Sequence, residues 1–243
     1  MIFMNIPSLY SLFQERWGKF QTGWMISDTH FGDEDLRAGM PNRPSDEEIV
    51  KSINSKVGKN DLLIHMGDVG NIEYVRQLKG YKVLIMGNHD AGASNYKRHR
   101  EMVVINAHDF TQEEAMGEMK RRYPGYFIKF ECMGKAGWVF SIDNKLFDEV
   151  YEGALIIGEK LILSHEPVEI PWAFNIHGHN HQGNVKTSNH LNVCADVVGY
   201  VPVSLNKFLK EGYLSKIQTI HRVCIDNAIE RKKKRGGKKI GQR

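Results

Sequence analysis

Cysteine is scarce in this chain of 243 residues, which contains only Cys132, Cys194 and Cys224. The three cysteines are far apart, odd in number and form no Cys-x-x-Cys pair, so the sequence excludes a scaffold built on disulfides. None has the spacing of a metal ligand, and we interpret all three as small apolar residues. Reduced thiols fit a reducing compartment, and we expect a cytoplasmic protein.

Long hydrophobic runs are also absent. The longest are short pieces such as residues 83–86, far below the roughly 18 residues of a membrane-spanning helix. Residues 1–14 lack the basic start and the small-residue cleavage site of a secretory signal. The sequence therefore predicts neither a membrane partner nor export.

The formal charge of +4 does not describe the folded part of the chain. Residues 231–243 alone carry eight Lys or Arg, and the rest of the chain has 25 of the 33 basic residues against all 29 acidic ones. We therefore expect one domain over residues 1–230, mildly acidic, and a basic, disordered tail over 231–243. The tail is either an arm that binds nucleic acid or a solubilising end, and its lack of aromatic residues gives no support for base stacking.

Apolar runs alternate with helical signals along the chain. Strands are expected at the runs that share this pattern: 24–26, 62–64, 83–86, 161–163 and 173–176. Ser45 and Glu48 form a capping box before a helix that reaches Val57, and further helices are expected over 6–20, 71–79, 203–211 and 217–228. Residues 154–163 resemble a hairpin. This alternation predicts an α/β fold.

The pattern changes between residues 101 and 147, where we expect an insertion. Thr111 and Glu114 predict a capped helix, Pro124 and Gly125 break it, and β-like pieces follow at 126–130 and 138–142. A segment of this kind is the first candidate for a wall that shapes the substrate site.

Each predicted strand is followed by Asp, Asn or His. In chain order these are Asp28-Thr29-His30, Gly67-Asp68, Gly87-Asn88-His89-Asp90, Ser164-His165 and Gly178-His179-Asn180-His181. Carboxylate, imidazole and amide oxygen suit divalent ions such as manganese, iron or zinc. In extended chain, residues i and i+2 point the same way, so Asp28 with His30, and His179 with His181, can each present two ligands to one place. His65 and His177 lie within apolar runs and are expected to support the site rather than bind metal.

This ordered set of motifs resembles the calcineurin-like metallophosphoesterases, and the match spans residues 25–182 apart from the insertion. The resemblance implies a four-layer α/β/β/α sandwich with an inserted segment after the Gly-Asn-His-Asp loop. It also implies two divalent metal ions, manganese first, with iron, zinc, nickel and magnesium left open.

Residue roles follow from the same resemblance. One ion is expected on Asp28, His30, Asp68 and His181, and the other on Asp68, Asn88, His165 and His179, with Asp68 bridging. His89 is expected to contact the phosphate or protonate the leaving group, and Asp90 to orient His89.

The resemblance implies a metal-dependent phosphatase or phosphodiesterase that attacks phosphorus in line with a metal-bridging hydroxide. The substrate is a phosphorylated small molecule or a nucleotide, and the ligand set does not choose between a monoester and a diester. The alternative is a nucleic-acid-binding protein or a nuclease that uses the basic tail. The sequence leaves the oligomeric state open.

Overall fold

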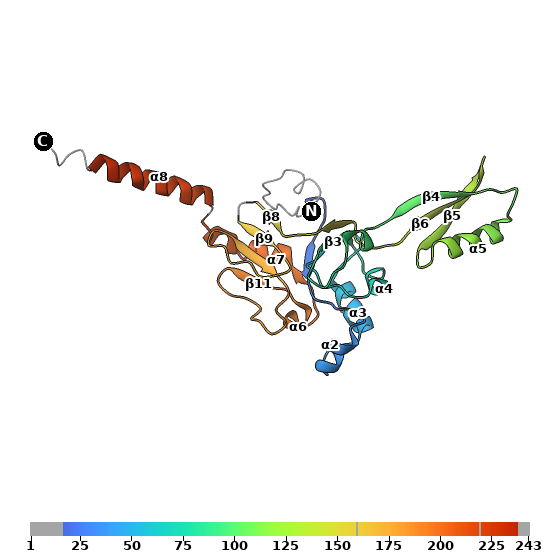
Figure 1. The fold of residues 1–243 in the computed structure, drawn as a ribbon, viewed down its shortest axis with the longest axis horizontal. Coiled ribbons are helices and arrows are strands. Elements are labelled where there is room, and N and C mark those ends of the chain that lie inside the picture. The colour runs from blue at the N-terminus through green and yellow to red at the C-terminus, as the bar shows by residue number, and fades with distance from the viewer. Residues whose placement is uncertain (1–16, 159, 219, 238–243) are drawn as a thin grey trace.

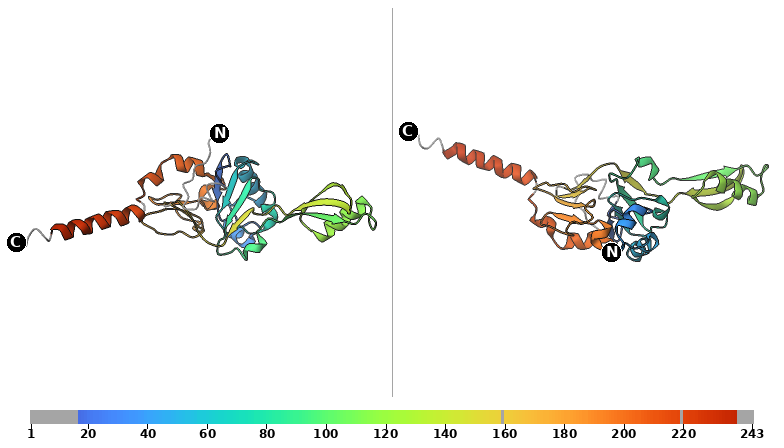
Figure 2. Two further views of the ribbon diagram at one scale, coloured as in Figure 1. Left: turned by 90° about the horizontal axis from the view of Figure 1, so that it is seen from above. Right: turned by 60° about the horizontal axis from the view of Figure 1, so that its bottom comes forward.

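The computed structural model describes residues 17–158, 160–218 and 220–237, and its path is drawn in Figure 1. The helix expected over 6–20 therefore lies almost entirely outside the described residues. Two sheets pack against each other in the centre, a smaller three-stranded unit projects to one side, and a long helix projects to the other (Figures 1 and 2).

The first central sheet has five strands in the order β12-β1-β2-β3-β7. Its strands are β1 (Gly23–Ile26), β2 (Leu62–His65), β3 (Tyr81–Ile85), β7 (Glu149–Tyr151) and β12 (Val203–Ser204). All pairs are parallel except that between β1 and β12. The apolar runs at 24–26, 62–64 and 83–86 thus form strands as predicted, and the α/β class is confirmed.

The second central sheet has the order β11-β10-β9-β8. Its strands are β8 (Leu155–Ile157), β9 (Leu161–Leu163), β10 (Phe174–His177) and β11 (His190–Asn192). Strands β8 and β9 form the predicted hairpin, and β9, β10 and β11 are parallel.

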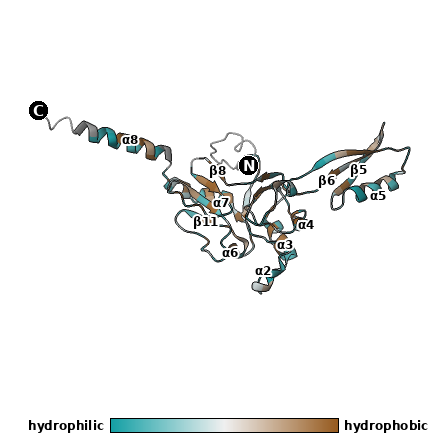
Figure 3. Cartoon of the chain, viewed as in Figure 1, coloured by the Kyte–Doolittle hydropathy of each residue, from teal (hydrophilic) through white to brown (hydrophobic). Residues whose placement is uncertain are grey.

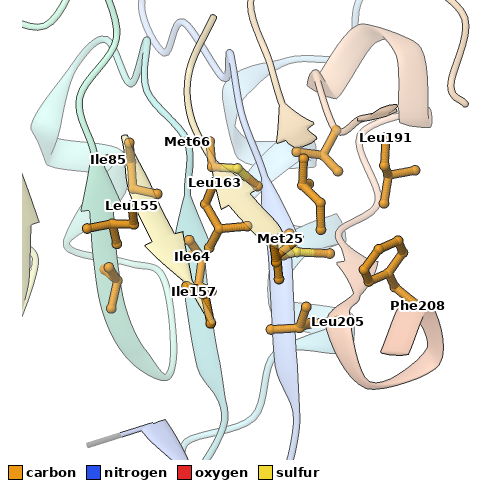
Figure 4. Close-up of a cluster of buried hydrophobic side chains, with 14 of the residues drawn as sticks. Met25, Ile64, Met66, Ile85, Leu155, Ile157, Leu163, Leu191, Leu205 and Phe208 are labelled. Carbon is orange, nitrogen blue, oxygen red and sulfur yellow. The ribbon is translucent and has the colours of Figure 1, made fainter. Parts of the chain in front are cut away.

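The main hydrophobic core lies between the two sheets (Figure 4). Met25 and Ile64 from the first sheet face Leu163 from the second, and Leu205 and Phe208 from helix α7 (Leu205–Lys210) complete the cluster. Each such side chain contributes about 1.5–3 kcal/mol when fully buried. This packing holds the ends of both sheets at fixed positions.

Helices cover the outer face of the five-stranded sheet. In α3 (Asp46–Lys56), Ser45 and Glu48 form the predicted capping box, and Ile49 and Ile53 pack on the sheet one helical turn apart. Helix α4 (Ile72–Val75) is shorter than the predicted 71–79, and α2 (Glu34–Gly39) precedes α3. Short segments complete the body: η1 (Ala93–Asn95), α6 (Ala195–Val198) and η2 (Tyr213–Lys216).

Residues 100–143 form a separate unit with its own core. Strands β4 (Arg100–Ile105), β5 (Phe127–Gly134) and β6 (Gly137–Asp143) pair antiparallel in the order β4-β6-β5, and α5 (Gln112–Arg122) packs on one face. The helix begins with the capping box predicted from its sequence. Figure 3 shows α5 as mainly hydrophilic along its visible side.

The position of this unit corrects one expectation. Its root, at Arg98, Arg100 and Asp148, lines a cavity of about 440 Å³ together with residues that directly precede β1, β2 and β3. The root therefore lies at the amino ends of these strands, and the unit extends away from the body (Figure 2). The prediction that the insertion forms a wall of the site is wrong, because the site lies at the opposite, carboxyl ends.

The last helix, α8 (Ile220–Gly237), extends away from the body (Figure 1). It includes residues 231–237 of the segment that the composition predicted to be disordered. Lys and Arg favour helices, Arg222 pairs with Asp226 one turn later at 3.1 Å, and the helix ends at two glycines. Among the described residues, no helix combines the length and the apolar character that crossing a membrane requires.

Candidate metal centre

The five motifs meet at one edge of the two sheets. Asp28, Asp68 and Asn88 follow β1, β2 and β3, and the histidines at 165, 179 and 181 follow β9 and β10. The carboxyl ends of parallel strands share an edge, so residues up to 153 positions apart come within a few ångströms. The structure brings together all seven predicted metal ligands.

The first predicted ligand group consists of Asp28, His30, Asp68 and His181. The distance from His30 Nε2 to Asp68 Oδ2 is 3.6 Å, and that from His181 Nε2 to Asp28 Oδ1 is 3.7 Å. One ligand atom each from Asp28, His30 and Asp68 lies within 4.8 Å of the others.

The second predicted ligand group consists of Asp68, Asn88, His165 and His179. His165 Nε2 lies 3.3 Å from Asp68 Oδ2 and 2.9 Å from Asn88 Oδ1, and His179 Nδ1 lies 3.2 Å from His165 Nε2. Two donors that are each about 2.1 Å from one metal ion lie roughly 3.0–3.4 Å apart. The distances of 2.9–3.3 Å in the second group are therefore those of ligands arranged around one cation, and the distances of 3.6 and 3.7 Å in the first group are slightly wider.

Unpartnered polar atoms point to the same interpretation. In Asp28, Oδ2 accepts hydrogen bonds from the Ser27 hydroxyl and the His179 amide, whereas Oδ1 is buried and has no partner among the described residues. His30 Nε2 is likewise buried without a hydrogen bond. Buried polar atoms without partners are costly, and a bound divalent cation would satisfy both atoms. The residues therefore fit a metal.

The charge states of Asp68 and His30 suit metal binding. Burial by itself raises the pKa of Asp68, but hydrogen bonds from His165 and from the His89 amide outweigh it and lower the pKa to about 2. Burial lowers the pKa of His30. Asp68 is therefore ionised and His30 neutral near pH 7, and these are the forms that bind metal.

The backbone is strained where it presents ligands. Asp28, His30, Asp68 and His179 have positive φ angles of 56°, 39°, 54° and 65°. L-residues rarely adopt this region, and such strain is concentrated at functional sites. At Gly178 a Cβ atom would lie 2.3 Å from Asp28 Oδ2, so only glycine allows this approach.

His89 and Asp90 lie beside the ligands but in different settings. His89 is exposed, and the centroid of its ring lies 5.5 Å from that of His30. The Asp90 carboxylate accepts hydrogen bonds from the backbone amides of Asp68 at 2.9 Å, Val69 at 3.0 Å and Gly87 at 2.9 Å. These partners join two ligand loops, so Asp90 clamps the loops together, whereas the sequence predicted that it orients His89.

Three supporting residues were missed by the sequence analysis. Asp196 Oδ2 lies 2.6 Å from His181 Nδ1, and Asp196 Oδ1 lies 2.7 Å from the guanidinium of Arg43 and accepts the Tyr200 hydroxyl. Asp196 follows β11 closely, so the rule that placed the ligands at strand ends could have found it. Arg43 and Tyr200 carry no comparable signal.

His65 lies where the sequence predicted, beside the site, whereas Cys194 lies closer to the predicted ligands than its spacing in the sequence indicated. The Thr29 hydroxyl donates to Val69 O at 3.0 Å and so accepts from His65 Nε2 at 2.9 Å, which makes His65 a support for the Asp28 loop. Burial lowers the pKa of His65 to about 4. Cys194 is buried, and its Sγ lies with ligand atoms of Asp28 and His181 within 4.8 Å of one another, so its position is also compatible with a metal ligand. Burial raises the pKa of its thiol.

Comparison with known proteins identifies the family of this chain. The sequence model of the calcineurin-like phosphoesterase family matches residues 24–196, which contain every predicted ligand, and the chain belongs to this family. A solved structure, a protein of unknown function from Aquifex aeolicus, is 22% identical with a TM-score of 0.48 over 78% of this chain and 98% of that chain. No curated protein matches the sequence.

Proposed function

We propose that this chain is a divalent-metal-dependent phosphohydrolase that holds two ions, one on each ligand group, with Asp68 shared between them. The observation that carries the proposal is the position of Asp68 Oδ2, which lies 3.6 Å from His30 Nε2 and 3.3 Å from His165 Nε2. One carboxylate oxygen thus faces ligands of both groups.

The charges of the site favour a phosphate ester. Its two carboxylates do not neutralise two divalent ions, so the loaded site is positive and attracts an anionic substrate. Bound divalent ions lower the pKa of water and stabilise charge on phosphoryl oxygens. His89 is exposed beside the first ligand group, in a position to donate a proton to a phosphoryl oxygen or to the leaving group.

The mixed nitrogen and oxygen donors accept several ions. We propose manganese, with iron, zinc, nickel and magnesium as alternatives that the donor set also tolerates. The three cysteines are free, which supports a cytoplasmic location. Fractionation of cells and metal analysis of the protein purified from them would test both proposals.

Metal removal tests the main proposal. The metal-free protein, restored with Mn²⁺, should hydrolyse a chromogenic phosphodiester or phosphomonoester, and Asp68→Ala should abolish both metal binding and turnover. The ratio of diester to monoester turnover indicates the substrate class. Turnover that survives in Asp68→Ala would contradict the proposal.

A second variant tests the role of His89. His89→Ala should retain bound metal and lose most hydrolysis, because a proton donor contributes about 10²–10⁴-fold to such a reaction. Full activity of this variant would rule out that role.

A nuclease that approaches polynucleotides through α8 is the second candidate function. The observation in its favour is the exposed row of Arg231, Lys232, Lys233 and Lys234 on a helix that leaves the body. Truncation after Glu230 should then weaken polynucleotide cleavage at moderate salt and leave small substrates unaffected. Equal effects on both substrates would contradict this candidate.

A further inference from the structure

A buried charged link connects the two loops that supply the first ligand group. Arg43 donates through one nitrogen to Asp196 Oδ1 at 2.7 Å and through another to the carbonyl oxygen of Thr29, which lies between Asp28 and His30. Side-chain exposure is 1% for Arg43 and 7% for Asp196. A buried ion pair with further hydrogen bonds is costly to break from one side, so it holds both loops in register.

Asp196 also decides which nitrogen of His181 is free. Its Oδ2 lies 2.6 Å from His181 Nδ1, so Nδ1 carries the proton and the lone pair of Nε2 faces Asp28 Oδ1 at 3.7 Å. The ring can act as a ligand only in this tautomer.

The second ligand group is held in a different way. His165 Nδ1 contacts the backbone oxygen of Met66 at 2.8 Å, and His165 and His179 share the side-chain oxygen of Asn88. No hydrogen bond or ion pair among the described residues joins Arg43 or Asp196 to Asn88, His165 or His179.

We propose that Arg43 and Asp196 are positioning residues for one of the two ions only, the ion on Asp28, His30, Asp68 and His181. This proposal rests on the proposed function. The link fixes the tautomer of His181 and the distance between the His181 loop and the Asp28 loop. The histidines of the other ion are held instead by the backbone oxygen of Met66 and the side-chain oxygen of Asn88.

Asp196→Asn is the sharpest test, because the substitution keeps the shape of the side chain. Arg43 and Tyr200 both donate to the Oδ1 position, so the amide oxygen is held there and the NH₂ group faces His181. His181 Nδ1 must then accept, and the proton moves to Nε2, where it blocks ligation. We expect affinity for one ion to fall about 10- to 100-fold while the other ion binds as before.

The experiment titrates metal-free protein with Mn²⁺ by calorimetry and follows the spin coupling of the two ions by electron paramagnetic resonance. The variant should show one tight ion and a mononuclear signal. Glu169→Gln is the matched control, since it also removes a carboxylate beside a histidine, 3.2 Å from His190, and should bind both ions normally. The tautomer of His181, read from long-range ¹H–¹⁵N spectra of the metal-free protein, should change in Asp196→Asn only.

Tyr200→Phe provides a second variant if Asp196→Asn fails to fold, because it removes only one hydroxyl from Asp196. It should weaken the same ion by a smaller factor. Normal binding of both ions by a folded variant, or equal weakening of both ions, overturns the proposal. Wild-type protein that binds fewer than two ions would instead refute the proposed function, before any variant is compared.

Discussion

Asp90→Asn distinguishes a clamp from a residue that orients His89. In the structure, Asp90 Oδ2 accepts from the amides of Asp68 and Gly87, and Oδ1 accepts from the amide of Val69. An asparagine can keep an oxygen at the Oδ2 position, facing the amides of Asp68 and Gly87, only by turning its NH₂ group toward the Val69 amide. Two donors then face each other, and the amide of a fully buried residue loses its partner.

The expected cost follows from this hydrogen bonding. A buried amide without a partner costs about 1–3 kcal/mol, and the two remaining bonds lose the benefit of a charged acceptor, so we expect a total of about 2–4 kcal/mol. For a chain of this size the melting temperature falls by about 2–4 °C per kcal/mol. The metal-free variant should therefore melt roughly 4–16 °C below the wild type.

Thermal unfolding of the metal-free proteins, followed by circular dichroism, measures this shift. Asp109→Asn, an exposed aspartate in the projecting unit, is the control and should melt like the wild type. If Asp90 instead orients His89, Asp90→Asn should melt normally and alter only the pH profile of turnover. That result would refute the clamp.

Three further predictions concern other parts of the chain. Gly178→Ala should lose bound metal, because the added Cβ would lie 2.3 Å from Asp28 Oδ2. Gly153→Ala, which has open space around it, is the control and should keep its metal. The metal content of the two purified variants tests this prediction. Replacing residues 101–142 by two glycines should leave small-substrate hydrolysis unchanged, because Arg100 and Asp143 are paired neighbours; reduced kcat would place the unit at the site after all. Burial lowers the pKa of Lys82 from 10.5 to about 8. Between pH 8 and 10.5 the unfolded chain therefore binds more protons than the folded chain, and the free energy of unfolding should rise with pH by about 2–3 kcal/mol across that range. Urea unfolding should show this rise in the wild type and not in Lys82→Met.

Features that depend on neighbouring residues were predictable from the sequence. The capping boxes before α3 and α5 appeared as predicted, because each joins residues three positions apart. The strands that precede the ligands were also found, since apolar runs of this length become buried strands. The helix over residues 231–237, the first part of the basic segment, was not predicted. A composition rich in charge suggested disorder, whereas the same Lys and Arg residues favour helix.

The sequence by itself determined which residues offer metal ligands and in what order they occur, because residue type and strand-end position are local properties. Only the tertiary structure decided what holds those ligands. Arg43 and Asp196 are 153 residues apart, Asp90 bonds backbone amides that carry no sequence signal, and the insertion lies at the far ends of the strands. These contacts arise when the two sheets pack and place distant loops side by side, and no local pattern records that packing.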